Sequence, residues 1–172
     1  MKRILAVLTV LAIAIFGVGC SNTGGSSASA EEIYTGIKEK IVWDLKAVGY
    51  QDADFAAEEL PGYVVTDLKG EGAEYVLAQL DKADVEEGFV IKASMMVSSD
   101  QIALIKAAPG KMETIQEALE AELASQLALW ESYLADQAEK VQNAIITIRG
   151  DIIIYITYPD AEAIEAVFNE AF

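Results

Sequence analysis

Carboxylates are the side chains most available for chemistry in this chain. Of its 172 residues, 28 are Asp or Glu, 12 are Lys or Arg, none is His and one is Cys. Without histidine there is no Ser-His-Asp or Cys-His catalysis and no histidine-containing zinc site. A single cysteine excludes an internal disulfide and a CxxC redox pair. The net charge of −16 repels phosphate backbones, so nucleic acid is excluded as a partner.

The one cysteine lies at the end of an N-terminal pattern typical of an export signal. Met1-Lys2-Arg3 is followed by an apolar run over residues 4–16 and then by Gly17-Val18-Gly19-Cys20. Basic, apolar and small residues in this order are the layout of a signal peptide. A membrane anchor needs about 20 apolar residues, whereas residues 4–19 number only 16. Export is therefore favoured over a membrane-spanning segment.

Val18-Gly19-Cys20 resembles the end of the lipobox of bacterial lipoproteins, in which a small residue precedes the cysteine that becomes lipidated. The match departs at Gly17, where a larger aliphatic residue is typical. The resemblance implies a lipoprotein signal peptide over residues 1–19 and lipid attachment at Cys20. Ordinary secretory cleavage and a plain anchor are the alternatives.

Lipidation at Cys20 would hold the chain at the cell membrane, facing outward from the cytoplasmic membrane. Residues 20–30, rich in Gly and Ser, would form a flexible tether. Residues 31–172 would form a single domain beyond it. Without Lys2 and Arg3, 10 basic residues remain against 28 acidic ones, a net charge of −18. An anionic membrane surface repels such a domain, so lipid alone would supply the attachment.

Hydrophobic periodicity predicts an N-terminal helical segment. Apolar residues recur every three or four positions over residues 31–48, as in an amphipathic helix. A shorter helix is expected over residues 51–59. Residues 63–87 give the least readable pattern, with a loop at Gly70 and Gly72 and a short helix over residues 73–80.

From residue 89 the predicted order is strand, strand, helix, strand, strand, helix. Alternating and continuous apolar runs indicate the strands, and turn or breaker residues separate them. The fold class is therefore α+β, an antiparallel sheet of about four strands packed with helices. Residues 152–156 are apolar at odd and even positions alike, which indicates an interior strand buried on both faces. The predicted ranges are strands over 89–97, 101–107, 144–148 and 152–158, a helix over 111–136, and a last helix from 161 capped by Asp160.

Several short motifs in the C-terminal half resemble a domain-of-unknown-function family of small Gram-positive lipoproteins, chiefly from anaerobic Firmicutes. The resemblance covers roughly residues 84–172 and implies an exported, lipid-anchored domain. It brings no activity, ligand or catalytic residue. The motifs that carry it are the run from Met95 to Lys106, Tyr133-Leu134 with Gln137, Val141-Gln142-Asn143-Ala144, and Arg149-Gly150-Asp151.

Two local motifs have structural explanations. Arg149-Gly150-Asp151 spells an integrin-binding tripeptide, but a hairpin turn with glycine at positive φ explains it. Met95-Met96 brings together two ligands of the kind that soft metals prefer, yet adjacent strand residues point to opposite faces. We expect both methionines to fill the core.

The acidic residues are expected to form a solvated face. None of their clusters matches a calcium-binding loop, although weak cation binding stays open. Glycoside hydrolysis needs only two carboxylates, so a carboxylate-dependent hydrolase acting on cell-wall material is a second possibility. No signature of a nucleotide-binding, serine-hydrolase or dinucleotide-binding protein occurs. The clusters are Asp52 with Asp54, Glu58 with Glu59, Asp67 with Glu71 and Glu74, and Asp84 with Glu86 and Glu87.

Lys92 and Lys106 each interrupt an apolar strand. The simplest explanation is an edge or solvent-facing position, where lysine discourages strand pairing. A lysine on a sheet face beside Tyr133 or Tyr155 could instead bind an anionic ligand.

These observations favour a non-enzymatic envelope module that binds another envelope protein or a small molecule. The sequence predicts no catalytic, cofactor or metal-ligating residue. A two-lobed solute-binding protein is disfavoured because it needs a longer chain.

Overall fold

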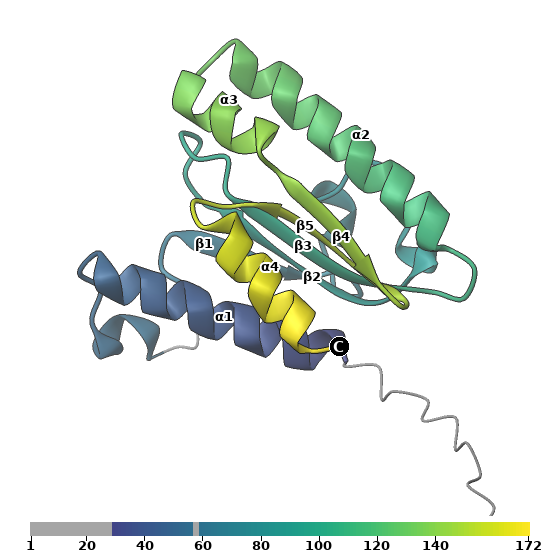
Figure 1. Ribbon diagram of the computed structural model, residues 1–172, viewed down its shortest axis with the longest axis horizontal. Helices are drawn as coiled ribbons and strands as arrows, with labels where there is room; N and C mark the ends of the chain where they lie inside the picture. Colours follow the sequence, from purple (N-terminus) through teal and green to yellow (C-terminus); the bar gives the residue numbers. More distant parts are fainter. Residues whose placement is uncertain (1–28, 57–58) are drawn as a thin grey trace, which may run out of the picture.

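The computed structural model describes residues 29–56 and 59–172. Within them, a five-stranded antiparallel sheet has helices on both faces (Figure 1). The fold class is therefore α+β, as predicted, with one strand more than expected. The strands, in the order β1-β2-β3-β5-β4, are β1 (Tyr63–Asp67), β2 (Val85–Ala93), β3 (Gln101–Ala107), β5 (Ile152–Thr157) and β4 (Ile145–Arg149).

One face of the sheet is covered by α1 (Ala30–Ala47) and α4 (Ala161–Glu170), which lie side by side (Figure 1). Ile33, Ile37 and Ile41 of α1 meet Phe168 of α4 over the even-numbered isoleucines of β5. Helix α1 begins with a capping box, in which Ser29 and Glu32 bond to each other's backbone N–H. The carboxylate of Glu87 in β2 also accepts hydrogen bonds from the backbone N–H groups of Ala30 and Glu31. This strand therefore fixes where the helix starts.

The other face is covered by α2 (Met112–Glu131), with α3 (Ala135–Gln142) against the end of α2. Ile115 and Leu119 of α2 contact Ile105 of β3 and Ile153 and Tyr155 of β5. Because both of its faces are covered, every residue of β5 is buried. The interior, two-sided position predicted for this strand is confirmed.

The second hairpin and the last helix lie close to their predicted ranges. Gly150 takes φ 58° in the turn between β4 and β5, as expected for the Arg149-Gly150-Asp151 motif. Asp160, however, makes no side-chain cap at the start of α4. Its carboxylate instead pairs with Lys40 of α1.

Four element predictions were wrong in extent or type. The strand expected over residues 89–97 begins earlier and ends at Ala93. The helix expected over 111–136 stops at Glu131 and a separate α3 follows, since the chain turns so that Val141 can pack on Trp130. The short helices expected over 51–59 and 73–80 are represented by the 3₁₀ turns η1 (Asp52–Phe55) and η2 (Ala73–Tyr75), and residues 57–58 lie outside the described part.

The methionines at the β2–β3 connection were also expected in the wrong place. Because β2 ends at Ala93, Met95 and Met96 lie in the loop beyond the sheet and are exposed, Met96 by 90%. They do not fill the core.

Among the described residues, no helix has the length and apolar content needed to cross a membrane. The signal peptide and Cys20 predicted from the sequence lie outside this part of the chain.

Candidate functional site

A polar network crosses the end of the sheet at which β1 and β3 begin and β5 ends. Tyr63 is the first residue of β1, Asp100 immediately precedes β3, and Tyr158 immediately follows β5. Helix α1 adds Lys40 and Asp44, and α3 adds Lys140. Antiparallel pairing brings these strand ends together.

Asp100 is a buried member of this network, with 7% of its surface exposed. Its Oδ1 pairs with Nζ of Lys140, and its Oδ2 accepts a hydrogen bond of 2.9 Å from the Tyr63 hydroxyl. Burial, reinforced by the negative charge of Asp100, raises the pKa of Tyr63 well above its ordinary value. The tyrosine therefore stays a neutral donor to the carboxylate.

Tyr158 continues the network toward α1. Its hydroxyl donates to Asp44 Oδ2 at 3.0 Å, and its ring lies 6.5 Å from that of Tyr63, centroid to centroid. Lys40 bonds Asp44 at 2.6 Å and Asp160 at 3.1 Å. Burial alone would lower the pKa of Lys40, but the bonds and charges of the two aspartates raise it. Burial, with Tyr63 and Asp44 nearby, also raises the pKa of Tyr158 far above its ordinary value.

Ser99 and Gln137 attach α3 to this end of the sheet. The Oε1 atom of Gln137 accepts bonds from the Ser99 backbone N–H at 2.8 Å, from its hydroxyl at 3.0 Å and from Lys140 Nζ at 3.1 Å. One amide oxygen thus positions both the loop before β3 and the lysine that pairs with Asp100.

Two hollows flank Tyr158 and share it with Pro159 and Asp160, and together they form what we call the Tyr158 cleft. The larger, of about 630 Å³, opens between α3 and the start of α4. The smaller, of about 360 Å³, lies against the C-terminal half of α1. The larger is lined in addition by Asp136, Glu139, Lys140, Asn143, Ile145, Ala161 and Glu162, and the smaller by Asp44, Leu45, Ala47, Val48 and Tyr63.

Each buried carboxylate of the described residues forms an ion pair with a lysine. Asp84, 7% exposed, bonds Lys111 at 2.7 Å, as Asp100 bonds Lys140. A general acid for glycoside hydrolysis needs an apolar setting that keeps its proton. A carboxylate in contact with an ammonium group lacks that setting. In residues 29–56 and 59–172, no three carboxylates or cysteines are grouped so as to hold a metal ion.

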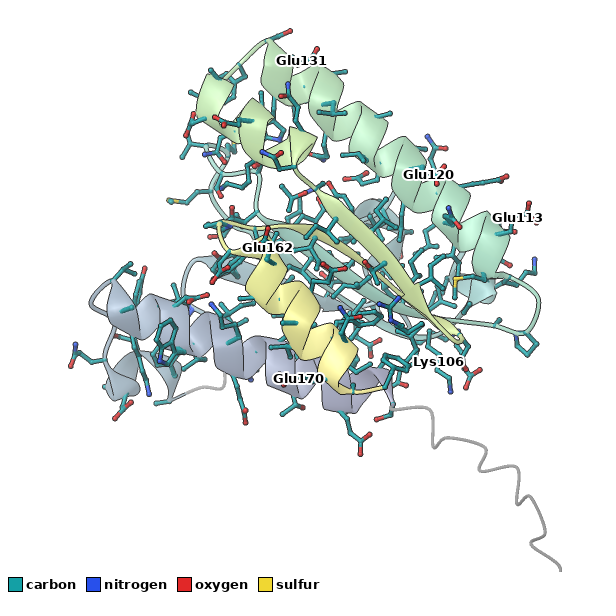
Figure 2. All side chains as sticks on the ribbon, in the orientation of Figure 1. Lys106, Glu113, Glu120, Glu131, Glu162 and Glu170 are labelled. Atoms are coloured by element: carbon teal, nitrogen blue, oxygen red, sulfur yellow. The ribbon has the colours of Figure 1, made fainter. Side chains whose placement is uncertain are left out.

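Several of the acidic residues singled out in the sequence have local structural roles, while Glu58 lies outside the described residues. Asp54 accepts a bond from the Gln51 backbone N–H and Asp67 from that of Lys69, while Asp52 pairs with Lys46. Other glutamates face solvent: Glu113, Glu120 and Glu131 lie along α2 on the side away from the sheet, and Glu162 and Glu170 lie on α4 (Figure 2).

Lys106 lies at the opposite end of β3 from the Tyr158 cleft. It bonds Glu86 at 2.7 Å and is 4.0 Å from Asp151, and the Glu86 bond raises its pKa. Of the edge or solvent-facing position expected for Lys106 and Lys92, the edge alternative is wrong, because β3 and β2 both have neighbours on each side, and both lysines are partly exposed. The carboxylate of Glu86 accounts for the lysine at position 106.

Sequence reasoning missed Lys40, Asp44, Tyr63, Lys140 and Tyr158. They come from α1, β1, α3 and the residue after β5, and only Lys40 and Asp44, four positions apart on α1, share a regular spacing. The available signal was the pair of tyrosines that open β1 and follow β5: Tyr63 comes two residues after Pro61, and Tyr158 directly precedes Pro159. This signal can be interpreted only once the start of β1 and the end of β5 are known to lie at the same end of the sheet.

The Asp100–Lys140 pair is testable by a double-mutant cycle. We predict that Asp100→Asn and Lys140→Met each lower the free energy of unfolding by about 2–4 kcal/mol, because each leaves a partly buried charge unpaired. The double variant should lose clearly less than the sum, as measured by urea denaturation. The exposed pair Lys46–Asp52, whose side chains are 45% and 90% exposed, is the matched control and should show no measurable coupling. Additive losses at Asp100 and Lys140 would contradict the pairing.

The buried tyrosines predict a loss of stability at alkaline pH. An unfolded tyrosine ionises near pH 10, whereas the pKa values of Tyr63 and Tyr158 lie well above this and burial raises that of Tyr155 to about 12. Above pH 10 the unfolded chain therefore binds fewer protons than the folded one. Below pH 10 these tyrosines contribute fully to the free energy of unfolding. Above pH 10 that free energy should fall by about 1.4 kcal/mol per pH unit for each such tyrosine.

Tyrosinate absorbance checks this prediction. Tyr63, Tyr155 and Tyr158 should ionise only as the protein unfolds, and Tyr158→Phe should make the loss of stability above pH 10 shallower. Ionisation of all seven tyrosines near pH 10 with the fold intact would be the contrary result.

Comparison with known proteins identifies one family and no close relative of known activity. A search of curated proteins and of solved structures found no match. The family model described as "Domain of unknown function (DUF4358)" matches residues 70–158. This range holds β2 to β5, α2 and α3, and with them Asp100, Gln137, Lys140 and Tyr158. The match covers more than half of the chain, which therefore belongs to the DUF4358 family of domains of unknown function.

Proposed function

We propose that this protein is a non-enzymatic binding module, exported and held at the outer side of the cell membrane by lipid on Cys20. Its binding site is the Tyr158 cleft. The observation that carries the proposal is that two hollows meet at one buried, neutral tyrosine whose hydroxyl is fixed by Asp44. Ligand sites combine concave surface with a few fixed polar groups in this way.

The lining of the cleft favours a ligand that carries positive charge. In the larger hollow, four carboxylates accompany a single lysine, and that lysine already pairs with Asp100. The smaller hollow has apolar walls from Leu45, Val48 and Pro159, with Asp44 and Asp160 beside them. An amine on an apolar body matches both parts, and a small amine or a basic side chain of another envelope protein has this chemistry. The four carboxylates are Asp136, Glu139, Asp160 and Glu162.

Binding is favoured over a carboxylate-dependent hydrolase by the state of the carboxylates. The two buried ones in the described residues each contact a lysine, and those of the larger hollow lie at its exposed rim or pair with Lys40. None of them has the apolar, unpaired setting that raises the pKa of a catalytic acid.

The membrane attachment rests on the N-terminal sequence. Cys20 is the single cysteine and follows the small residues at which lipoprotein signal peptides are cleaved. The Gly- and Ser-rich residues after it would let the acidic domain stand clear of the lipid headgroups.

A calorimetric titration with phenethylamine tests the cleft. We expect the amine to bind the purified protein more tightly than phenethyl alcohol, its neutral counterpart. Glu139→Gln combined with Glu162→Gln should weaken amine binding about tenfold, since two rim charges are lost. The matched control is Glu113→Gln with Glu120→Gln on the outer side of α2, which removes the same charge far from the cleft. Equal weakening by the two double variants, or no preference for the amine, would overturn the proposed ligand class.

Metabolic labelling with a fatty-acid probe tests the anchor. The wild-type protein should take up the label, and Cys20→Ala should abolish it, because no other thiol is present. Ser21→Ala, next to the attachment residue, should keep the label. A labelled Cys20→Ala protein would refute lipidation at this position.

A further inference from the structure

Lys92, Gln101 and Thr157 lie in one row across the sheet, on the face covered by α2. Gln101 is the direct partner of Lys92 in the β2–β3 ladder and of Thr157 in the β3–β5 ladder. They point to the same side of the sheet as Val90, Ala103 and Tyr155, which belong to the core beneath α2. This row ends the α2 face at the same end of the sheet as the Tyr158 cleft.

Gln101 is buried without hydrogen-bond partners. The residue is 2% exposed, and neither the Oε1 nor the Nε2 atom of its side chain forms a hydrogen bond with any described residue. Leaving an amide unpaired in the interior is costly, and natural proteins rarely keep one without a reason. Residues of the same size without polar atoms would pack here at lower cost.

Lys92 is also unpaired. It is partly buried, yet it makes no ion pair or hydrogen bond with the described residues. Directly opposed residues on an antiparallel pair have Cβ atoms about 5 Å apart. Gln101 is therefore the neighbour of Lys92 on this face of the sheet.

A hollow of about 240 Å³ opens at Lys92, between the β2–β3 loop and the C-terminal half of α2. Met95, Leu129 and Trp130 give it apolar walls. The indole N–H of Trp130 is bonded to Gln126 Oε1 at 2.9 Å, which fixes the ring. We call this hollow the Lys92 pocket. Its remaining lining is Ala93, Ser94, Met96, Ser98, Ser99 and Gln126.

We propose that the Lys92 pocket binds a carboxylate carried on a short apolar stem. The Lys92 ammonium pairs with the carboxylate, and the stem lies against Trp130 and Met95. The volume is smaller than that of a typical drug-sized site, so the ligand is a small acid or the last residue of a peptide chain. This site shares no lining residue with the Tyr158 cleft and prefers the opposite charge. The test of the Lys92 pocket is therefore independent of the test of the proposed function.

The probes are phenylpropionate and the peptide Gly-Gly-Phe, each compared with its carboxamide. Binding to the purified full chain is followed by the indole N–H resonance of Trp130, with the exposed Trp43 on α1 as an internal reference. We expect the acids to shift the Trp130 resonance and the amides to bind at least tenfold more weakly. If the peptide alone binds, the ligand is a chain terminus; if phenylpropionate binds as well, it is a free acid. Equal binding of acids and amides would overturn the proposal.

Lys92→Met tests the charged group and keeps an apolar side chain of similar length. It should weaken phenylpropionate binding at least tenfold. Lys38→Met is the matched control, because Lys38 is also partly exposed and without an ion pair but lies on α1. Equal affinities of the two variants would contradict the assignment of Lys92.

Gln101→Met tests whether the ligand lies in the Lys92 pocket or deeper, against the buried face of the sheet. Removing the unpaired amide should raise the melting temperature by about 3 °C, while phenylpropionate binding stays within twofold because Gln101 does not line the pocket. A loss of binding as large as that of Lys92→Met would place the ligand outside the Lys92 pocket and overturn the proposal.

Discussion

Burial of both faces of one sheet is the constraint on which the rest of this structure depends. Strand β5 holds four isoleucines, one tyrosine and one threonine, and all six of these residues are buried. Such a strand is stable only if helices cover each face. The α1–α4 layer meets its even-numbered side chains, and α2 meets the odd-numbered ones. Both helical layers are therefore required by this strand.

Polar chemistry is consequently confined to the ends of the sheet. Between the layers the backbone groups are used in the strand ladders, and the side chains are apolar. At the end where β3 begins, however, the chain leaves the sheet and its residues pass to different sides. Asp100 bonds Lys140 and Tyr63, while the next residue, Gln101, lies under the α2 face. Two consecutive residues thus belong to opposite faces of the sheet.

The strongly periodic elements could be predicted from the sequence. Continuous or alternating apolar runs marked β3, β4 and β5, and the order of strands and helices indicated the α+β class. Strand β1 was missed because it is an edge strand with exposed Val64 and Val65, so burial leaves no alternation in its sequence. The break between α2 and α3 was missed because Leu134 continues the helical spacing. It packs with Trp130 from beyond the turn.

The site was less predictable than the fold for a physical reason. Its members are joined by tertiary contacts across sequence separations as large as the 114 positions between Asp44 and Tyr158. A lysine within an apolar strand was visible in the sequence, and Lys92 does line a pocket. Whether such a lysine is paired, as Lys106 is with Glu86, depends on which strand lies beside it.

A map of backbone amide shifts during titration with phenethylamine tests the central claim, that the sheet end around Tyr158 is a binding site, most directly. Shifts are expected to gather at the end of α1, at residues 158–162 and on α3, and to spare the outer side of α2. Shifts spread evenly over the acidic surface, with none concentrated at Tyr158 and Asp160, would contradict this account.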